Sequence, residues 1–245
     1  TVSIAAWAVF SKRAMAPLCA AGHSLGEYSA LVATGSLPLG AAVRAVRERG
    51  RFMQEAVPAG VGAMAAVLGL PADQVGQVCA RLAQGRVLSP ANYNSPEQTV
   101  IAGHADAVEG AAKPMQEAGA KRVVPLQVSA PFHCALMEPV KPLLREVLKA
   151  AAFAPPRSPV VTNVEAKPNS DPNRTLPLLL EQVSQPVRWV ECVEEMRRQG
   201  VTHFVELGPG KVLRGLIKQI SKDTPVFGVE DAQGLEKALA GVSGG

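Results

Sequence analysis

Aromatic side chains make up only 4% of this 245-residue sequence, and charged residues make up only 19%. With so few rings, the interior must be filled by aliphatic side chains and alanine, which favours closely packed layers of helices and strands. No apolar stretch approaches the ~18 residues that a membrane-spanning helix needs, so a membrane protein is not expected. There is also no internal repeat or low-complexity tract. The composition predicts a globular protein with one large domain, or one domain that carries an insert.

Cysteine is scarce as well, and no C-x-x-C pair occurs among Cys19, Cys79, Cys134 and Cys192. This scatter predicts reduced thiols and a cytoplasmic protein. A net charge of +4 is too small to predict nucleic-acid binding, although it is compatible with an acidic partner. The opening T-V-S-I-A-A-W-A-V-F has no basic segment and no initiator methionine, so it is not expected to be a signal peptide. Because it opens in the middle of a helical pattern, we expect that an upstream segment was removed.

The segment at 60–128 follows the order β-α-β-β-α-β. Its expected strands are 63–68, 87–91, 98–102 and 123–128, its expected helices are 71–84 and 105–118, and a turn is expected at 92–96. This order is that of the ferredoxin-like split unit. The sequence therefore predicts a ferredoxin-like small subdomain at 60–128, inserted into a large subdomain made of residues 1–59 and 129–245.

Outside the insert, apolar runs of strand length alternate with helical patterns. The expected strands are 18–22, 160–164, 204–207 and 226–229, and the expected helices are 2–14, 25–35, 38–56, 134–151, 175–184, 188–199, 210–221 and 232–240. Such alternation predicts an α/β fold, with a parallel sheet covered by helices on both faces. The segment at 167–175, rich in polar residues and proline, predicts a surface loop.

The stretch G-H-S-L-G at 22–26 lies where an apolar run gives way to a helical pattern. At a strand-to-helix turn, G-x-S-x-G is the pattern of a nucleophile elbow, in which the glycines permit a tight backbone and the serine hydroxyl projects over the edge of the sheet. The N-terminus of the following helix offers free N–H groups to a developing oxyanion. The alternative is that Ser24 only caps the helix.

A nucleophilic serine needs a base, and the sequence has four histidines. His133, in S-A-P-F-H-C, lies where the insert returns to the large subdomain, and clefts form at such junctions. It is the best candidate, with a buried structural histidine as the alternative. His23 is expected to pack or hydrogen-bond beside Ser24, His104 to cap a helix and His203 to begin a strand.

The two helices on either side of the turn at 35–37 are expected to form an antiparallel hairpin. Ser24 is about twelve residues before this turn and Arg49 about twelve after it, so equal rises of ~1.5 Å per residue bring them side by side. Arg49 can then clamp a substrate carboxylate through two hydrogen bonds. The alternative is a solvated basic face, because Arg44, Arg47 and Arg51 share this helix.

Five stretches, taken together, resemble one known family. They are G-H-S-L-G-E-Y-S-A, R-G-R-F-M-Q-E-A, N-Y-N-S-P-E-Q-T-V-I-A-G, S-A-P-F-H-C and E-L-G-P-G-K-V-L. In this order and spacing they are similar to the malonyl-CoA:acyl carrier protein transacylases of bacterial fatty acid synthesis, and the resemblance runs from end to end of the chain. It implies an α/β-hydrolase-like large subdomain with a ferredoxin-like insert.

The resemblance also implies roles for individual residues. Ser24 would accept the acyl group, His133 would be its base, and Arg49 would pair with the malonyl carboxylate. Gln182 matches the position whose backbone carbonyl orients the histidine in place of an acid. The reaction implied is transfer of malonyl from coenzyme A to the phosphopantetheine thiol of acyl carrier protein, with no metal or redox cofactor.

Three further positions match the surroundings of the family's substrate. The N–H of Leu25 would be one oxyanion donor, Asn92 would line the pocket, and Leu25 and Phe132 resemble members that select malonyl over methylmalonyl groups. The family's N-terminal strand and its F-P-G-Q-G-S-Q loop, whose glutamine gives the second oxyanion N–H, have no match in this sequence.

Two other interpretations are open at this point. One is a serine hydrolase, since Ser24, Asp171 and His203 have the chain order of an α/β-hydrolase triad. The other is a scaffold without catalytic activity that binds the carrier protein, an interpretation that rests on the unmatched N-terminal loop.

Overall fold

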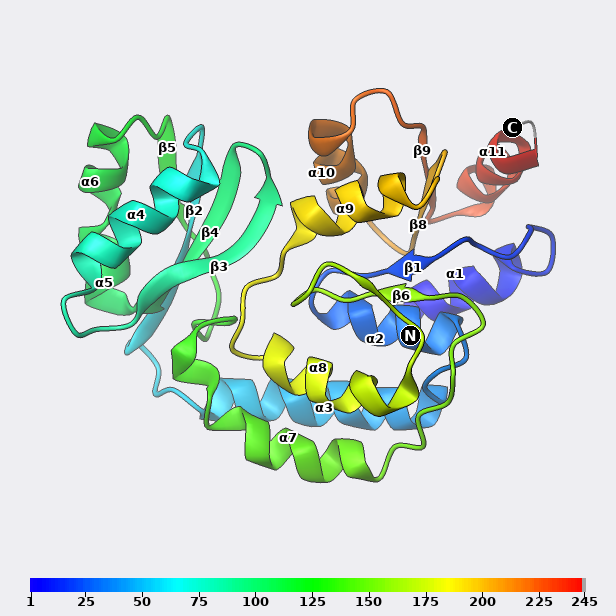
Figure 1. The fold of residues 1–245 in the computed structure, drawn as a ribbon, viewed down its shortest axis with the longest axis horizontal. Helices are drawn as coiled ribbons and strands as arrows, with labels where there is room; N and C mark the ends of the chain where they lie inside the picture. Colours follow the sequence, from blue (N-terminus) through cyan, green and yellow to red (C-terminus); the bar gives the residue numbers. More distant parts are fainter. Residues whose placement is uncertain (244–245) are drawn as a thin grey trace.

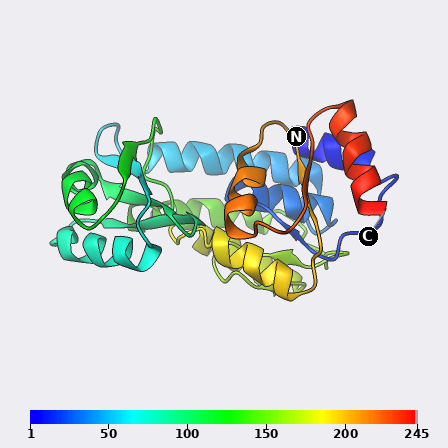
Figure 2. The same cartoon turned by 90° about the horizontal axis from the view of Figure 1, so that it is seen from above.

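The computed structural model describes residues 1–243, which form two lobes (Figure 1). The smaller lobe lies at one end of the molecule, as the view from above shows (Figure 2). The chain enters this lobe at the end of a long helix, α3, and returns from it just before His133. No helix among the described residues is both long enough and apolar enough to cross a membrane.

The larger lobe consists mostly of helices. Its elements are α1 (Val2–Phe10), β1 (Ala20–Ala21), α2 (Leu25–Ala33), α3 (Leu39–Glu55), the 3₁₀ helix η1 (Ala135–Met137), α7 (Val140–Lys149), β6 (Val160–Val161), β7 (Pro168–Asn169), α8 (Pro172–Gln182), α9 (Trp189–Arg198), β8 (Phe204–Leu207), α10 (Val212–Ile220), β9 (Val226–Val229) and α11 (Ala232–Ser243). The surface loop predicted at 167–175 is wrong, because β7 and the first turn of α8 lie there. Asp171 begins this helix by accepting a hydrogen bond from the N–H of Asn173.

The strands of the larger lobe are short and form two separate sheets. In one, β1 pairs in parallel with β6, which pairs antiparallel with β7; in the other, β8 pairs in parallel with β9. Within residues 1–243, no ladder joins the two sheets. The structure thus has the predicted mixture of helices and parallel strand pairs, but not one continuous parallel sheet.

The smaller lobe is a four-stranded antiparallel sheet with three helices. Its elements are β2 (Gly62–Leu68), α4 (Ala72–Ala83), β3 (Leu88–Ser95), β4 (Gln98–His104), α5 (Ala105–Gly110), α6 (Ala112–Glu117) and β5 (Arg122–Pro125), and the strand order is β3-β4-β2-β5. The turn predicted at 92–96 is wrong, because β3 continues to Ser95. Its middle is held from outside the lobe: Tyr93 donates its N–H to the carbonyl of Val187 at 2.9 Å.

Both faces of the smaller lobe's sheet are covered. Along β2, Ala65 and Val67 pack against the helices, whereas Met64 and Ala66 face the opposite way. Side chains alternate across a strand, so this pattern places helices on one face and the returning chain on the other. That returning chain contributes Phe132, which packs against this sheet and against the core of the larger lobe.

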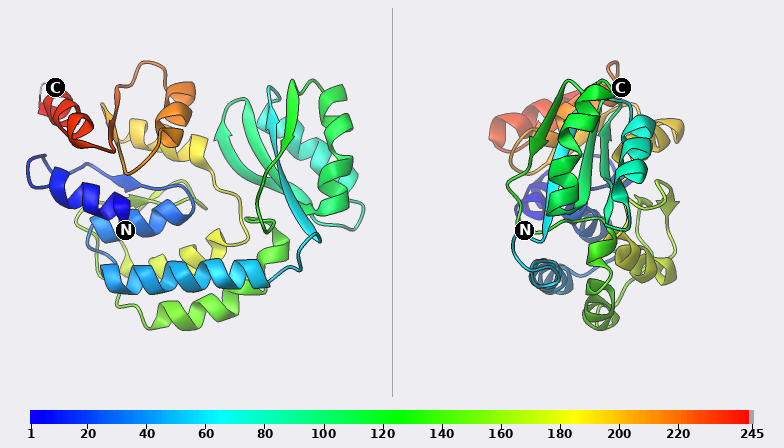
Figure 3. Two further views of the ribbon diagram at one scale, coloured as in Figure 1. Left: turned by 180° about the vertical axis from the view of Figure 1, so that it is seen from behind. Right: turned by 90° about the vertical axis from the view of Figure 1, so that its left-hand side faces the viewer.

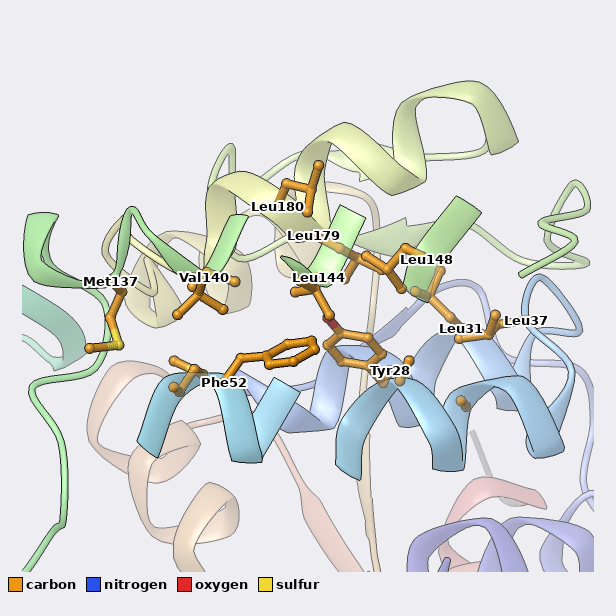
Figure 4. Packing of buried hydrophobic residues seen from close by; sticks show 14 of the residues in the cluster. Tyr28, Leu31, Leu37, Phe52, Met137, Val140, Leu144, Leu148, Leu179 and Leu180 are labelled. Atoms are coloured by element: carbon orange, nitrogen blue, oxygen red, sulfur yellow. The ribbon is translucent and has the colours of Figure 1, made fainter. Parts of the chain in front are cut away.

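The main core of the larger lobe lies between α2 and α3 on one side and α7 and α8 on the other (Figure 4). It includes the rings of Tyr28 and Phe52, together with Leu144 and Leu148 of α7 and Leu179 and Leu180 of α8. On α3 the buried residues are Ala42, Ala45, Arg49, Phe52 and Met53, spaced three or four apart as a helix face requires. Arg49 therefore projects inward from α3, which leads directly into the smaller lobe (Figure 3).

Candidate active site

Ser24 lies on a tight turn between β1 and α2. Its backbone has φ 52° and ψ −106°, a combination that residues other than glycine rarely adopt. Gly22 permits the turn, since a Cβ there would lie 2.1 Å from the carbonyl carbon of Gly26. The Ser24 side chain makes no capping hydrogen bond to the helix that it precedes. The simple helix-cap interpretation is therefore wrong, and the hydroxyl is free for other partners.

His133 is the first of these partners. Its Nε2 lies 2.8 Å from Ser24 Oγ, and its Nδ1 lies 2.7 Å from the backbone oxygen of Gln182. A carbonyl only accepts, so Nδ1 carries the hydrogen and Nε2 is left to accept from the serine. Burial, and then the nearby guanidinium of Arg49, lowers the pKa of His133 to about 3. The ring is thus neutral and oriented as a base.

Arg49 is the second partner of the hydroxyl. Its Nη2 donates to Ser24 Oγ at 2.9 Å and to the side-chain oxygen of Gln182 at 3.1 Å. The guanidinium lies 5.8 Å from the centre of the Tyr28 ring, and only 6% of the residue is exposed. Burial lowers its pKa, although an arginine keeps its charge in proteins. The site therefore holds a cation within hydrogen-bond distance of the serine oxygen.

Two side chains behind these residues fix the turn itself. Asn163 accepts from the N–H of Ser24 at 2.7 Å and donates its amide to the carbonyl of Gly22 at 2.8 Å. Gln182 donates its amide to the carbonyl of Ser24 at 3.0 Å and to Oε2 of Glu27 at 2.8 Å. The turn is thus held from both its N–H and its C=O side.

Sequence reasoning missed Asn163 and Glu27. Asn163 follows β6, and the carboxyl ends of parallel strands meet at one edge of a sheet, which was a usable signal. Ser24 and Glu27 also have the S-x-x-E spacing of a capping box, which turns a glutamate back toward the helix start. In the structure Glu27 accepts instead from the N–H of Asn163 at 3.0 Å.

The three other predicted positions lie at the start of α2, in β3 and immediately before His133. Leu25 is half exposed, and its N–H belongs to the first turn of α2, which lies outside the helix's own hydrogen bonds. Asn92 is buried in β3, where it pairs with Val187. Phe132 precedes His133 at the seam between the lobes. Among the described residues, none of the three side chains hydrogen-bonds to Ser24.

The remaining histidines have other partners. His23 lies 2.8 Å from Asn94 Oδ1 through its Nε2, and its ring centre is 5.7 Å from that of Trp189. His104 occupies the predicted N-cap position of α5, but its side chain accepts from the N–H of Val87 and makes no capping hydrogen bond. His203 bonds to its neighbour Thr202. With Asp171 capping α8, the alternative hydrolase triad is not assembled.

No three side chains of His, Cys, Asp or Glu lie together as a metal site within residues 1–243. What the cluster does contain is a serine on a strand-to-helix turn, a neutral histidine held by a carbonyl, and a buried arginine. A serine and a histidine in this arrangement on an α/β framework are typical of enzymes that move acyl groups through the serine.

Comparison with known proteins makes the class specific. The chain belongs to the acyl transferase domain family, whose model matches residues 1–239. It is 47% identical over 240 residues to the malonyl CoA-acyl carrier protein transacylase of Escherichia coli O157:H7, and the match covers 98% of this chain and 78% of that protein. The resemblance found in the sequence motifs is thereby confirmed.

Solved structures agree with this assignment. An acyl carrier protein S-malonyltransferase from Vibrio cholerae has a TM-score of 0.95 and 47% identity, covering 97% of this chain and 78% of the other. A malonyl-transacylase in complex with a type II polyketide synthase acyl-carrier protein has a TM-score of 0.95 and 46% identity, covering 98% of this chain and 78% of the other. The shared architecture therefore extends over nearly the whole chain.

Proposed function

We propose that this protein transfers a malonyl group from coenzyme A to the phosphopantetheine thiol of acyl carrier protein, through a malonyl ester on Ser24. One observation carries the proposal: Ser24 Oγ lies between His133 Nε2 at 2.8 Å and Arg49 Nη2 at 2.9 Å. A hydroxyl placed between a base and a cation suits an acyl donor that bears its own carboxylate. The names of the relatives support the same substrates.

The first half-reaction forms the ester. Ser24 Oγ attacks the thioester carbonyl while Nε2 of His133 takes the hydroxyl proton, and the Leu25 N–H donates to the oxygen that becomes negative. The C–S bond then breaks, and His133 returns the proton to the departing sulfur of coenzyme A. A histidine with a pKa of about 3 is a strong acid once protonated, so it gives up that proton readily.

The second half-reaction reverses these roles. The phosphopantetheine thiol of the carrier protein loses its proton to His133, and its sulfur attacks the ester carbonyl. The C–Oγ bond breaks, and Ser24 regains the proton from His133. Arg49 holds the malonyl carboxylate throughout, so the acyl group keeps one orientation in both halves. No step requires a metal or a redox cofactor.

The finer fold assignment is part of this proposal. We interpret residues 60–128 as a ferredoxin-like small subdomain, which the strand order β3-β4-β2-β5 supports. Residues 1–59 and 129–243 would form an α/β-hydrolase-like large subdomain, for which the serine turn between β1 and α2 is the main argument; the last two residues of the predicted range, 244–245, lie outside the described residues. Asn92 and Phe132, where the two meet, would line the acyl pocket.

The test is direct. The chain is incubated with malonyl-CoA, and intact mass and peptide mapping locate the adduct. We expect one malonyl group on Ser24 and its loss when phosphopantetheine-bearing acyl carrier protein is added. Ser24→Ala is expected to give no adduct, and His133→Ala a rate at least ~100-fold lower.

His203→Ala is the matched control, because His203 hydrogen-bonds only to Thr202 among the described residues. It is expected to acylate at the native rate. A folded chain that takes up no malonyl group would favour the non-catalytic scaffold, and an adduct released to water as fast as to the carrier protein would favour a hydrolase.

A further inference from the structure

Glu27 is a buried carboxylate that the proposed mechanism does not use. It lies one turn into α2, and 2% of the residue is exposed. Its Oε2 accepts two hydrogen bonds, from the backbone N–H of Asn163 at 3.0 Å and from the side-chain amide of Gln182 at 2.8 Å. Burying an acid is costly, and burial raises the pKa of Glu27 to about 7 against the opposing effect of these two bonds and of Arg49.

The two residues that Glu27 holds are those that fix the reacting groups. Gln182 accepts from His133 through its backbone oxygen and from Arg49 through its side-chain oxygen. Asn163 accepts from the N–H of Ser24. One carboxylate oxygen is therefore connected, through two intermediates, to the serine, the histidine and the arginine. In an ordinary triad the acid contacts the histidine directly, whereas here Gln182 stands between them.

We propose that Glu27 is a positioning residue, and that its Oε2, by accepting from Asn163 and Gln182, sets the distance between Ser24 Oγ and His133 Nε2. The inference rests on the proposed function in taking these two groups as the reacting pair. It requires the acceptor oxygen and not the charge, because both contacts are hydrogen bonds from N–H groups to one oxygen. A glutamine at position 27 retains such an oxygen, whereas a methionine of similar length does not.

The experiment compares Glu27→Gln with Glu27→Met. The probe is phenylmethanesulfonyl fluoride, whose sulfur forms a bond to Ser24 Oγ as fluoride leaves and His133 takes the proton. Labelling rates per folded chain are measured by intact mass, and malonylation rates are measured in parallel as kcat and KM. Labelling by the sulfonyl fluoride needs no carboxylate on Arg49, so it tests the serine–histidine pair independently of the malonyl substrate.

We expect Glu27→Gln to label within about threefold of the native rate and Glu27→Met to label ~10–100-fold more slowly, as when outer hydrogen-bond partners are removed from a metal ligand. In malonylation the loss should fall mainly on kcat. Glu195 gives the control pair, Glu195→Gln and Glu195→Met, because it is 9% exposed and bonds only to Arg198 and Gln199 among the described residues. Both control variants should label alike.

Equal labelling rates for Glu27→Gln and Glu27→Met would overturn the inference and leave Glu27 with a packing role only. If Glu27→Met does not fold, Glu27→Asp replaces it: its carboxylate is one carbon short of both N–H groups, and native labelling by that variant would overturn the inference equally. A native chain that labels with the sulfonyl fluoride but takes up no malonyl group would refute the proposed function alone.

Discussion

Arg49 donates a hydrogen bond to Oγ of Ser24, so the cation occupies one lone pair of this oxygen. A substrate carboxylate placed on Arg49 competes for that donor. It also offsets the guanidinium charge that helps to hold the pKa of His133 low. In the proposed mechanism, binding of an acidic acyl group therefore frees a lone pair of Ser24 Oγ and raises the pKa of His133, so that recognition of the substrate also activates the serine.

Replacing Arg49 tests this coupling. We expect Arg49→Ala to reduce malonylation of Ser24 by ~100-fold or more, because a buried charge pair with the substrate is lost. Acetylation from acetyl-CoA should fall by less than ~tenfold, since acetyl has no carboxylate. Quenched reactions followed by mass spectrometry give both rates. Arg51→Ala is the control on the same helix, because its side chain is exposed and paired with Glu48 and Glu55. Equal losses of the malonylation and acetylation rates in Arg49→Ala would contradict the argument.

The low pKa of His133 predicts an unusual pH profile. A base acts when unprotonated, and at pH 5 a histidine with a pKa near 6.5 is only about 3% unprotonated. With a pKa of about 3, His133 is almost entirely unprotonated at that pH. We therefore expect protonation of His133 to change kcat/KM for malonylation by less than ~threefold between pH 7 and pH 5. A fall of tenfold or more with an apparent pKa near 6.5 would show that the ring titrates normally.

At this scale, local sequence was informative about Ser24 and His133 because each lies in a short motif. Arg49 followed from counting residues along two helices of known rise. Asn163 and Glu27 escaped because their roles depend on a parallel pairing between strands far apart in the chain. The side chain of Gln182 makes four contacts whose geometry no spacing in the sequence encodes.

Among the elements around the site, the turn between β1 and α2 brings two backbone segments close together. Its two glycines are equivalent in the motif but not in the structure. A Cβ on Gly22 would lie 2.1 Å from backbone atoms of Gly26, whereas a Cβ on Gly26 would meet nothing within 4 Å. Only the first glycine is required by packing.

This difference predicts opposite effects of one added methyl group. Gly22→Ala should lower the free energy of unfolding by ~1–3 kcal/mol or more, because a rigid backbone cannot move aside. Gly26→Ala should raise it by roughly 0.5–1 kcal/mol, the helical advantage of alanine over glycine. Urea denaturation of both variants measures the difference. Destabilisation of similar size in both would show that the turn does not have this packing.

The elements that sequence patterns placed wrongly share a cause. The expected turn at 92–96 is strand because residues 92–95 pair with β4, and Val187 from the other lobe adds one bridge at Asn92. The expected loop at 167–175 contains β7, which exists only as the partner of β6. Helices were placed within a few residues because their patterns are local, whereas these short strands depend on tertiary partners.

On the scale of the whole molecule, β3 is the seam between the lobes. Besides its backbone bonds to Val187, it carries Asn94, whose side-chain oxygen lies within hydrogen-bond distance of His23, the neighbour of Ser24. The smaller lobe thus contacts the serine turn directly.

Removing the hydrogen bond between Asn94 and His23 should lower the stability of the contact between the lobes. We expect Asn94→Ala to lower the free energy of unfolding by about 1–2 kcal/mol, because His23 loses its hydrogen-bond partner. Asn173→Ala, at an exposed position in the first turn of α8, is the control and should change stability by less than ~0.5 kcal/mol. Chemical denaturation followed by circular dichroism provides both values, and an Asn94 variant as stable as the control would indicate that His23 needs no partner there.

His133 lies in the segment that returns from the smaller lobe, eight positions after β5 ends at Pro125. The imidazole is thus carried by the segment that joins the two lobes, whereas the Ser24 hydroxyl that it contacts belongs to the turn between β1 and α2 of the larger lobe. We expect a change in the path of this connecting segment to move the imidazole relative to Ser24. If the smaller lobe is exchanged with that of a relative, the connection from β5 to His133 must therefore be preserved as carefully as the core of the lobe. Otherwise we expect Ser24 to keep its position while His133 no longer reaches it.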